Sequence, residues 1–285
     1  MRIKARESGF GYLPDIMNSF APSIQTPGPS TANLRKVSVF LPKEHGSWSL
    51  ALEPLVLGLL VAPSAGGISL ALAMAAVFLV RRPLKLALSP GNGRWGVQIQ
   101  VTVLFVLYAG LGLVETTIPA GVGVLWPLLL VAPLGGLFAY FDRQGETRAV
   151  AAELCGSAAF ALLPAALATV AGWPAFAALG LAGVALTRSV PTVLTVRTAL
   201  RLSKGRPATP AIPLLASAGG FGFILLLATA GQVRWFALVP AALLLLRTLW
   251  WVSPLRPSWT ARRFGVFESL VGATCVLLNA FAYRL

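Results

Sequence analysis

The amino-acid sequence predicts an all-α protein, a polytopic transmembrane bundle of about nine helices with its N-terminus inside the cell. Apolar residues make up 56% of the chain and charged residues only 11%, whereas a soluble domain carries roughly 25% charged residues. Apolar runs recur from residue 48 to the C-terminus, and each is long enough to cross the roughly 30 Å core of a bilayer as a helix. Nearly all lysines and arginines fall on one side of the expected membrane.

The apolar runs set the expected order of the helices. Taken in turn, the predicted helices cover residues 46–63, 66–82, 97–114, 121–141, 149–171, 173–190, 211–230, 235–252 and 265–283. The segments "APSAGG", "IPAG" and "GWPA" are predicted to make short turns between helices, because proline and glycine favour turns. We therefore expect residues 41–285 to form a single transmembrane helical domain.

Residues 1–40 differ from the rest of the chain. They are polar, carry four prolines and lack the apolar stretch of a secretory signal. Such a composition cannot bury a core, so these residues are predicted to form a disordered cytosolic tail. A translation start at Met17 is an alternative that would shorten this tail.

The distribution of positive charge gives the expected orientation, because lysine and arginine beside membrane helices are retained in the cytoplasm. With nine crossings and an inside N-terminus, only Arg234 and Arg284 of the 23 lysines and arginines lie outside. This bias explains most of the net charge of +14. The expected partners are therefore membrane lipids with anionic headgroups, and not nucleic acid.

The sequence predicts no metal and no cofactor. Cys155 and Cys275 lie in different predicted helices, and His45 is the only histidine. Neither the CxxC nor the HExxH spacing of zinc sites occurs, and no Ser-His-Asp arrangement of a hydrolase is visible. A single histidine also leaves few axial ligands for haem.

Three acidic residues, Glu53, Glu153 and Glu268, fall within about two turns of a predicted helix start, all on the cytoplasmic side. One interpretation is that they stabilise helix N-termini. The other is that they face a shared cavity open to the cytosol, because a carboxylate facing lipid is costly. Glu53 is the deepest of the three and directly precedes Pro54.

Basic residues follow the second and sixth predicted helices in two similar segments, "VRRPLKLAL" and "LTRSVPTVL". After the second segment, Arg197, Arg201 and Lys204 recur at i, i+4 and i+7. A helix ending before Gly205 would present these three cations on one face. Such a helix either rests on lipid phosphates at the membrane surface or covers a cytosolic cavity and binds an anion.

The segment "LPKEHGSW" places Lys43, Glu44 and His45 at the cytoplasmic start of the first predicted helix. His45 and Glu44 are candidate catalytic residues, since an imidazole there can hydrogen-bond a phosphate or move a proton. The alternative is a helix-entry turn with interfacial charges and Trp48 in the aromatic belt.

The segments "PKEHGSW", "EPLVLGLL", "RRPLKL", "AELCG" and "TRSVPTVLTVRTALRL" resemble the YwiC-like family of bacterial membrane proteins. The resemblance covers about residues 40–285 and is most specific in the first segment. It implies a helical fold in the bacterial inner membrane and names no activity.

A more distant likeness is to UbiA-type intramembrane prenyltransferases, which "PLVLG" and "AELCGSAAFALLPAALA" resemble. These enzymes have nine helices and bind a prenyl diphosphate through magnesium, on aspartate-rich loops after helices two and six. The same two segments here contain no acidic residue, and Arg197 and Arg201 stand where the family has an aspartate pair. The likeness therefore implies a cavity in which guanidinium groups hold the phosphate directly. The expected anion-binding residues are Lys43, Arg82, Lys85, Arg188, Arg197 and Arg201.

Three functions of different class follow. The first, favoured by the architecture, is a UbiA-like protein that binds a lipid or isoprenoid phosphate, or a divergent prenyltransferase, with His45, Glu44 and Glu53 as catalytic residues. The second is a transporter of a small anion, whose site lies near the bilayer midplane. The third is a non-catalytic membrane component that assembles with another protein or with anionic lipid.

Overall fold

The computed structural model describes residues 45–87, 95–257 and 259–284, and within these ranges it contains nine α-helices, two 3₁₀ helices and no strand. The α-helices are α2 (His45–Val61), α3 (Ala65–Ala87), α4 (Trp95–Ala120), α5 (Leu128–Arg143), α6 (Val150–Val170), α7 (Ala175–Ser203), α8 (Ala211–Thr229), α9 (Leu238–Val252) and α10 (Ala261–Arg284). The 3₁₀ helices are η1 (Val122–Leu125) and η2 (Trp235–Ala237). The prediction of an all-helical fold with nine helices is confirmed over these ranges.

Seven of the described helices are long and apolar enough to cross a membrane, with η2 and α9 counted as one. The other two, α2 and α5, have 17 and 16 residues. At a rise of 1.5 Å per residue they are about 24–26 Å long, slightly less than the roughly 30 Å core of a bilayer. The chain is therefore a multi-pass membrane protein, whereas nine crossings and an inside N-terminus stay predictions.

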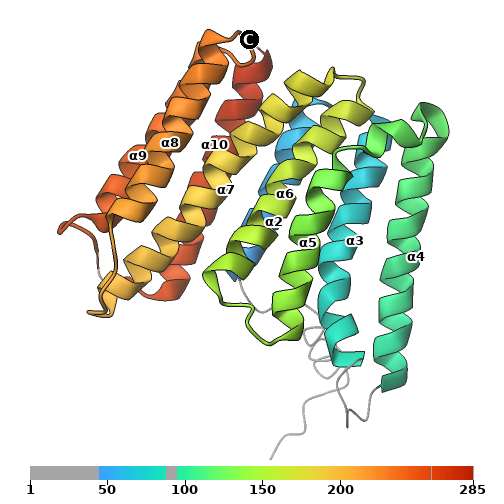
Figure 1. Ribbon diagram of the computed structural model, residues 1–285, viewed down its shortest axis with the longest axis horizontal. Helices are drawn as coiled ribbons and strands as arrows, with labels where there is room; N and C mark the ends of the chain where they lie inside the picture. The colour runs from blue at the N-terminus through green and yellow to red at the C-terminus, as the bar shows by residue number, and fades with distance from the viewer. Residues whose placement is uncertain (1–44, 88–94, 258, 285) are drawn as a thin grey trace, which may run out of the picture. The chain divides into compact units, whose positions relative to one another are not determined.

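The position of α2 brings distant parts of the chain together. It packs against α6 and α10 and also contacts α3 and α7, while α7 packs against α6, α8 and α9 (Figure 1). Small side chains permit this close packing, and Ala165, Ala168, Ala178 and Ala182 are buried in the core that α6 and α7 share. Glu53, at the middle of α2, is thereby placed next to α7 and α10.

Two helices continue beyond their predicted ends. The predictions placed these ends at residues 82 and 190, each close to a proline, but α3 extends to Ala87 and α7 to Ser203. Both Pro83 and Pro191 are buried inside their helices. Membrane helices tolerate an internal proline because neighbouring helices, polar side chains and local adjustments of the backbone can satisfy the freed carbonyl.

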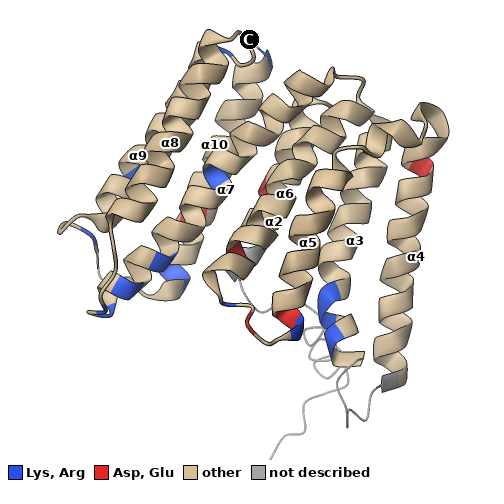
Figure 2. Cartoon of the chain, viewed as in Figure 1, with Lys and Arg blue, Asp and Glu red and all other residues tan. Residues whose placement is uncertain are grey.

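The basic segment after the sixth predicted helix is thus the end of α7 and not a separate surface helix. It stops where the sequence predicts, since Gly205 follows with a positive φ of 64°, a conformation that glycine adopts without strain. Figure 2 shows lysine and arginine concentrated at the end of the bundle where α3, α5 and α7 end and α10 begins.

At this basic end, Asp142 joins α5 to α3. Its carboxylate accepts hydrogen bonds from Arg81 Nε at 3.0 Å and from Lys85 Nζ at 2.9 Å. Burial acts to raise the pKa of Asp142, but the hydrogen bonds from Arg81 and Lys85 outweigh it and hold the pKa below its usual value. Arg81 also lies over the ring of Phe138, with 4.5 Å from its guanidinium carbon to the ring centre. Lys85, a predicted anion-binding residue, is therefore engaged by a carboxylate.

Candidate functional site

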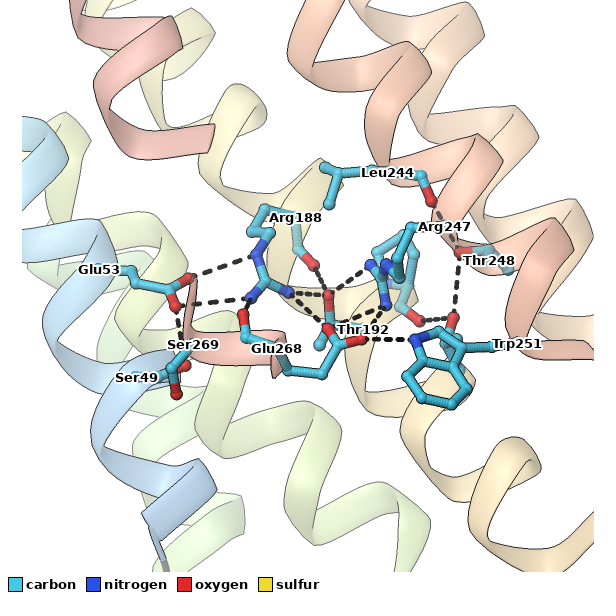
Figure 3. Close-up of polar contacts among 12 residues, drawn as sticks. Ser49, Glu53, Arg188, Thr192, Leu244, Arg247, Thr248, Trp251, Glu268 and Ser269 are labelled. Carbon is cyan, nitrogen blue, oxygen red and sulfur yellow. Dashed lines mark hydrogen bonds and ion pairs between the residues drawn. The ribbon is translucent and has the colours of Figure 1, made fainter. Parts of the chain in front are cut away.

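Four ionisable side chains from four helices meet inside the bundle: Glu53 of α2, Arg188 of α7, Arg247 of α9 and Glu268 of α10 (Figure 3). Arg188, Arg247 and Glu268 are only 5–6% exposed, and the Glu53 side chain is 11% exposed. Two positive and two negative charges balance, as expected where an unpaired charge costs several kcal/mol. We refer to these four residues as the buried charge network.

Arg188 lies between the two carboxylates. On one side, its Nε is 3.4 Å from Glu53 Oε2 and its Nη2 is 3.5 Å from Glu53 Oε1. On the other side, Nη1 is 3.7 Å from Glu268 Oε2, and Nη2 donates to the Glu268 backbone carbonyl at 2.8 Å. Arg188 therefore links α7 to both α2 and α10.

Glu268 is held more tightly than Glu53. Its Oε2 forms an ion pair with Arg247 Nη1 at 3.1 Å without hydrogen-bond geometry, and its Oε1 accepts hydrogen bonds from Arg247 Nη1 at 3.3 Å and from Trp251 Nε1 at 3.0 Å. Glu53 Oε1 accepts from the Ser49 hydroxyl at 2.7 Å, one turn earlier in α2. These contacts give Glu268 two donor side chains on α9 and leave Glu53 with Ser49 and Arg188.

Hydroxyl groups connect the two arginines and extend the polar region. The Thr192 hydroxyl accepts hydrogen bonds from Nη1 of Arg188 and, at 3.1 Å, from Nη2 of Arg247. Nearby, the Thr248 hydroxyl lies 3.3 Å from that of Thr195 and 2.9 Å from that of Ser217. Polar atoms of α7, α8 and α9 therefore form a buried layer beside the charges.

The absence of a side chain at Gly272 makes room for the network. A Cβ added there would overlap the Glu53 carboxylate and lie 2.6 Å from Arg188 Nη2. Contacts under 3.0 Å are essentially never observed for a real Cβ, so only glycine fits without a shift of these charged groups. Gly272 lies four residues after Glu268, hence on the same face of α10.

The local sequence explains how each helix presents its polar groups. On α7, Arg188, Thr192 and Thr195 follow a spacing of four and three residues, which puts them on one helix face. On α9, Arg247 and Trp251 are four residues apart and reach the same carboxylate. Each helix therefore contributes a narrow polar stripe on an otherwise apolar surface.

The structure brings together Glu53 and Arg188 of the predicted catalytic and anion-binding residues, and it adds Glu268, one of the three acidic residues singled out in the sequence. It places Arg197 in a separate ion pair with Glu153, at 2.7 Å between Nη1 and Oε2, with side chains 30% and 35% exposed. Arg201 is exposed. Arg188 and Arg201 are thirteen residues apart on one helix, which corresponds to about 20 Å. They therefore do not meet at one point of α7.

The remaining predicted residues lie apart from the buried charge network or outside the described residues. Arg82 and Lys85 are near the end of α3, at the basic end of the bundle. Lys43 and Glu44 fall outside the described residues. His45 is the first residue of α2, but its side chain is not described. The catalytic roles of His45 and Glu44 stay predictions.

Arg247 was not expected to be a site residue. Both Arg188 and Arg247 were counted among the cations on the cytoplasmic side, and the structure places them buried within α7 and α9. The signal was present: Arg247 is the only charged residue of α9, in "LVPAALLLLRTLWWV". An isolated cation inside an apolar run faces a partner in the bundle more often than it faces the cytosol.

Comparison with known proteins supports one part of the sequence analysis. Residues 41–168 match the family model described as YwiC-like protein. No curated protein and no solved structure matches the chain. The matched region includes Glu53 and ends before α7, so the other three members of the buried charge network lie beyond it. The resemblance to the YwiC-like family is thus confirmed over residues 41–168, and the chain is a multi-pass membrane protein similar to that family.

Proposed function

We propose that this membrane protein binds a phosphate-bearing anion inside its helical bundle, with Arg188 as the principal ligand. The observation that carries the proposal is a guanidinium at the middle of α7, 6% exposed, between two carboxylates. A guanidinium is permanently charged and forms paired hydrogen bonds with phosphate oxygens.

The hydrogen bonding of the arginines supports this function. Within the described ranges, Nε of Arg188 and Nε of Arg247 are buried and have no hydrogen-bond partner. The 3.4 Å approach of Arg188 Nε to Glu53 is an ion pair without hydrogen-bond geometry. Unsatisfied buried donors cost about 1–3 kcal/mol each, so a ligand oxygen that satisfies them binds favourably.

The free-energy cost of burying four charges is a second argument for a binding function. Well-packed apolar residues are often as stabilising as a buried ion pair, or more so. Stability alone therefore does not explain four buried charges. Ionisable residues inside membrane proteins commonly mark substrate or ion pathways. Two ligand sources share the required chemistry: an isoprenoid or lipid phosphate, as the UbiA-type likeness implies, and a small free anion. We place the protein in the bacterial inner membrane with its basic end in the cytoplasm.

Thermal unfolding of the detergent-purified protein tests the proposal. The probes are farnesyl diphosphate, inorganic phosphate and dimethyl phosphate, each with magnesium and with EDTA. A ligand at about 100 times its Kd adds about 2.7 kcal/mol to the free energy of unfolding. We expect at least one probe to raise the melting temperature in EDTA. Farnesyl diphosphate acting alone identifies an isoprenoid ligand, and inorganic phosphate acting alone identifies a small anion.

Three variants localise the binding. Arg188→Gln is expected to remove the stabilisation, whereas Arg201→Gln, on the exposed end of the same helix, retains it. Arg188→Lys keeps the charge and the balance of the network but loses the paired hydrogen bonds, so we expect a folded protein with weakened binding. Equal stabilisation of the wild type and both Arg188 variants, or no stabilisation by any probe, contradicts the proposal.

A further inference from the structure

We infer that Glu53 is the exchangeable carboxylate of the buried charge network: it takes up a proton and leaves Arg188 when the anion binds, while Glu268 stays in place. This inference rests on the proposed function and adds that the anion enters together with one proton. It assigns different roles to two carboxylates that flank the same arginine.

The contacts of the two carboxylates support this division. Glu268 is fixed from α9 by Arg247 at 3.1 Å and by Trp251 at 3.0 Å, and its side chain is 7% exposed. Among the described residues, Ser49 of the same helix is the one that donates to Glu53 at less than 3.4 Å, and the contacts of Glu53 with Arg188 are 3.4 and 3.5 Å. Departure of Glu53 from Arg188 therefore breaks two long contacts and keeps the hydrogen bond to Ser49. Glu268, whose carboxylate is 3.7 Å from Arg188, is instead held in place by Arg247 and Trp251.

The groups that surround Glu53 define its electrostatic environment. Arg188 faces it from α7, Glu268 and Cys275 from α10, and Arg247 from α9. The other two helices against α2 contribute apolar contacts, such as Leu70 of α3 and Leu163 of α6 packing near Leu55. Arg188 is therefore the positive charge closest to the Glu53 carboxylate, at 3.4 Å.

Charge balance links the proton to the anion. When Glu53 is ionised, the network is neutral, and a further anion would give it a net negative charge. Protonation of Glu53 at Oε2 leaves one uncompensated positive charge in a region of low dielectric, which is costly. A monoanion whose oxygens replace the carboxylate at Nε and Nη2 of Arg188 restores neutrality. The Ser49 hydroxyl remains hydrogen-bonded to Oε1, and the one bond formed is the O–H bond between Oε2 and a proton taken from the solvent.

The test uses dimethyl phosphate, which stays a monoanion through the neutral range, so that any pH dependence belongs to the protein. Binding to the detergent-purified full chain is measured by calorimetry across that range. For the wild type we expect the Kd to rise with pH, approaching tenfold per pH unit where Glu53 is ionised, as one linked proton requires. In weakly buffered solution the wild type should also take up close to one proton per anion bound.

Two variants separate Glu53 from other carboxylates. Glu53→Gln mimics the protonated form and should bind dimethyl phosphate at least as tightly as the wild type, with a Kd independent of pH. Glu153→Gln, which removes the carboxylate paired with Arg197, should keep the wild-type pH dependence. Anion binding without pH dependence or proton uptake by the wild type overturns the role of Glu53 alone. No binding to the wild type or to Glu53→Gln at any pH overturns the proposed function as well.

Discussion

Replacing Glu268 with glutamine is expected to lower the free energy of unfolding by about 3–5 kcal/mol, because it leaves two buried arginines with one carboxylate between them. The substitution keeps the shape of the side chain and removes only its charge. Arg247 would lose the negative charge that is now 3.1 Å from its Nη1 group, since the glutamine amide offers only a neutral oxygen acceptor. Denaturant unfolding of the protein in detergent measures the loss.

A double variant provides the control for Glu268. Arg247→Met combined with Glu268→Met removes one charge of each sign and leaves Arg188 paired with Glu53. Because replacing both partners of a buried ion pair with apolar residues is often neutral or stabilising, we expect the double variant to be more stable than Glu268→Gln. A single variant that loses less than about 1 kcal/mol, typical of exposed pairs, would show that these charges are not buried as described.

Gly272→Ala is expected to destabilise the protein by about 1–3 kcal/mol, the usual range when atoms are forced into a well-packed interior. The added methyl group would overlap the Glu53 carboxylate and crowd Arg188. Both side chains would have to move, so the variant should also lose the anion-dependent rise in melting temperature.

Gly265→Ala is the matched control for Gly272. It lies on the same helix, α10, and a Cβ added there meets no atom within 4 Å. Alanine favours a helix over glycine by up to about 1 kcal/mol, so this variant should be as stable as the wild type or slightly more stable. If both variants unfold at the same temperature, Gly272 does not accommodate the ion pair of Glu53 and Arg188.

The fold was largely predictable from the sequence because apolar length is a strong signal. Nine helices were expected and nine are found in the described ranges. The errors fall at the predicted ends at residues 82 and 190, because α3 and α7 continue past Pro83 and Pro191. A proline inside a helix usually bends or ends it in a soluble protein, whereas packed membrane helices tolerate it. The ends of α3 and α7 therefore depend on their neighbours.

The site was predictable only in part, since its residues come from four helices distant in sequence. Glu53 and Glu268 were recognised because a carboxylate near the membrane is rare, and Arg188 because it precedes a proline. Arg247 was missed because a charge count between helices cannot separate a cation near a helix end from one buried within α9. Nothing local in the sequence indicates that Glu268 pairs with Arg247 or that Gly272 lies against Glu53.

The UbiA-type likeness stays a prediction. It implied a single arginine clamp at the cytoplasmic ends of the second and sixth helices. Along α7, Arg188 and Arg197 are instead about 13 Å apart, and each contacts its own carboxylate. An anion at the network would therefore lie deeper in the membrane than one at Arg197 and Arg201.

Infrared difference spectroscopy tests the central claim most directly, because it observes the protonation of a carboxyl group on anion binding. Dimethyl phosphate is added to the purified protein at neutral pH, and the carbonyl band of a protonated carboxyl group is recorded. We predict that this band appears in the wild type and in Glu153→Gln, grows in proportion to the anion bound, and is absent in Glu53→Gln. Saturable binding to the wild type without the band, or the same band in Glu53→Gln, would contradict the exchange of Glu53 for the anion at Arg188.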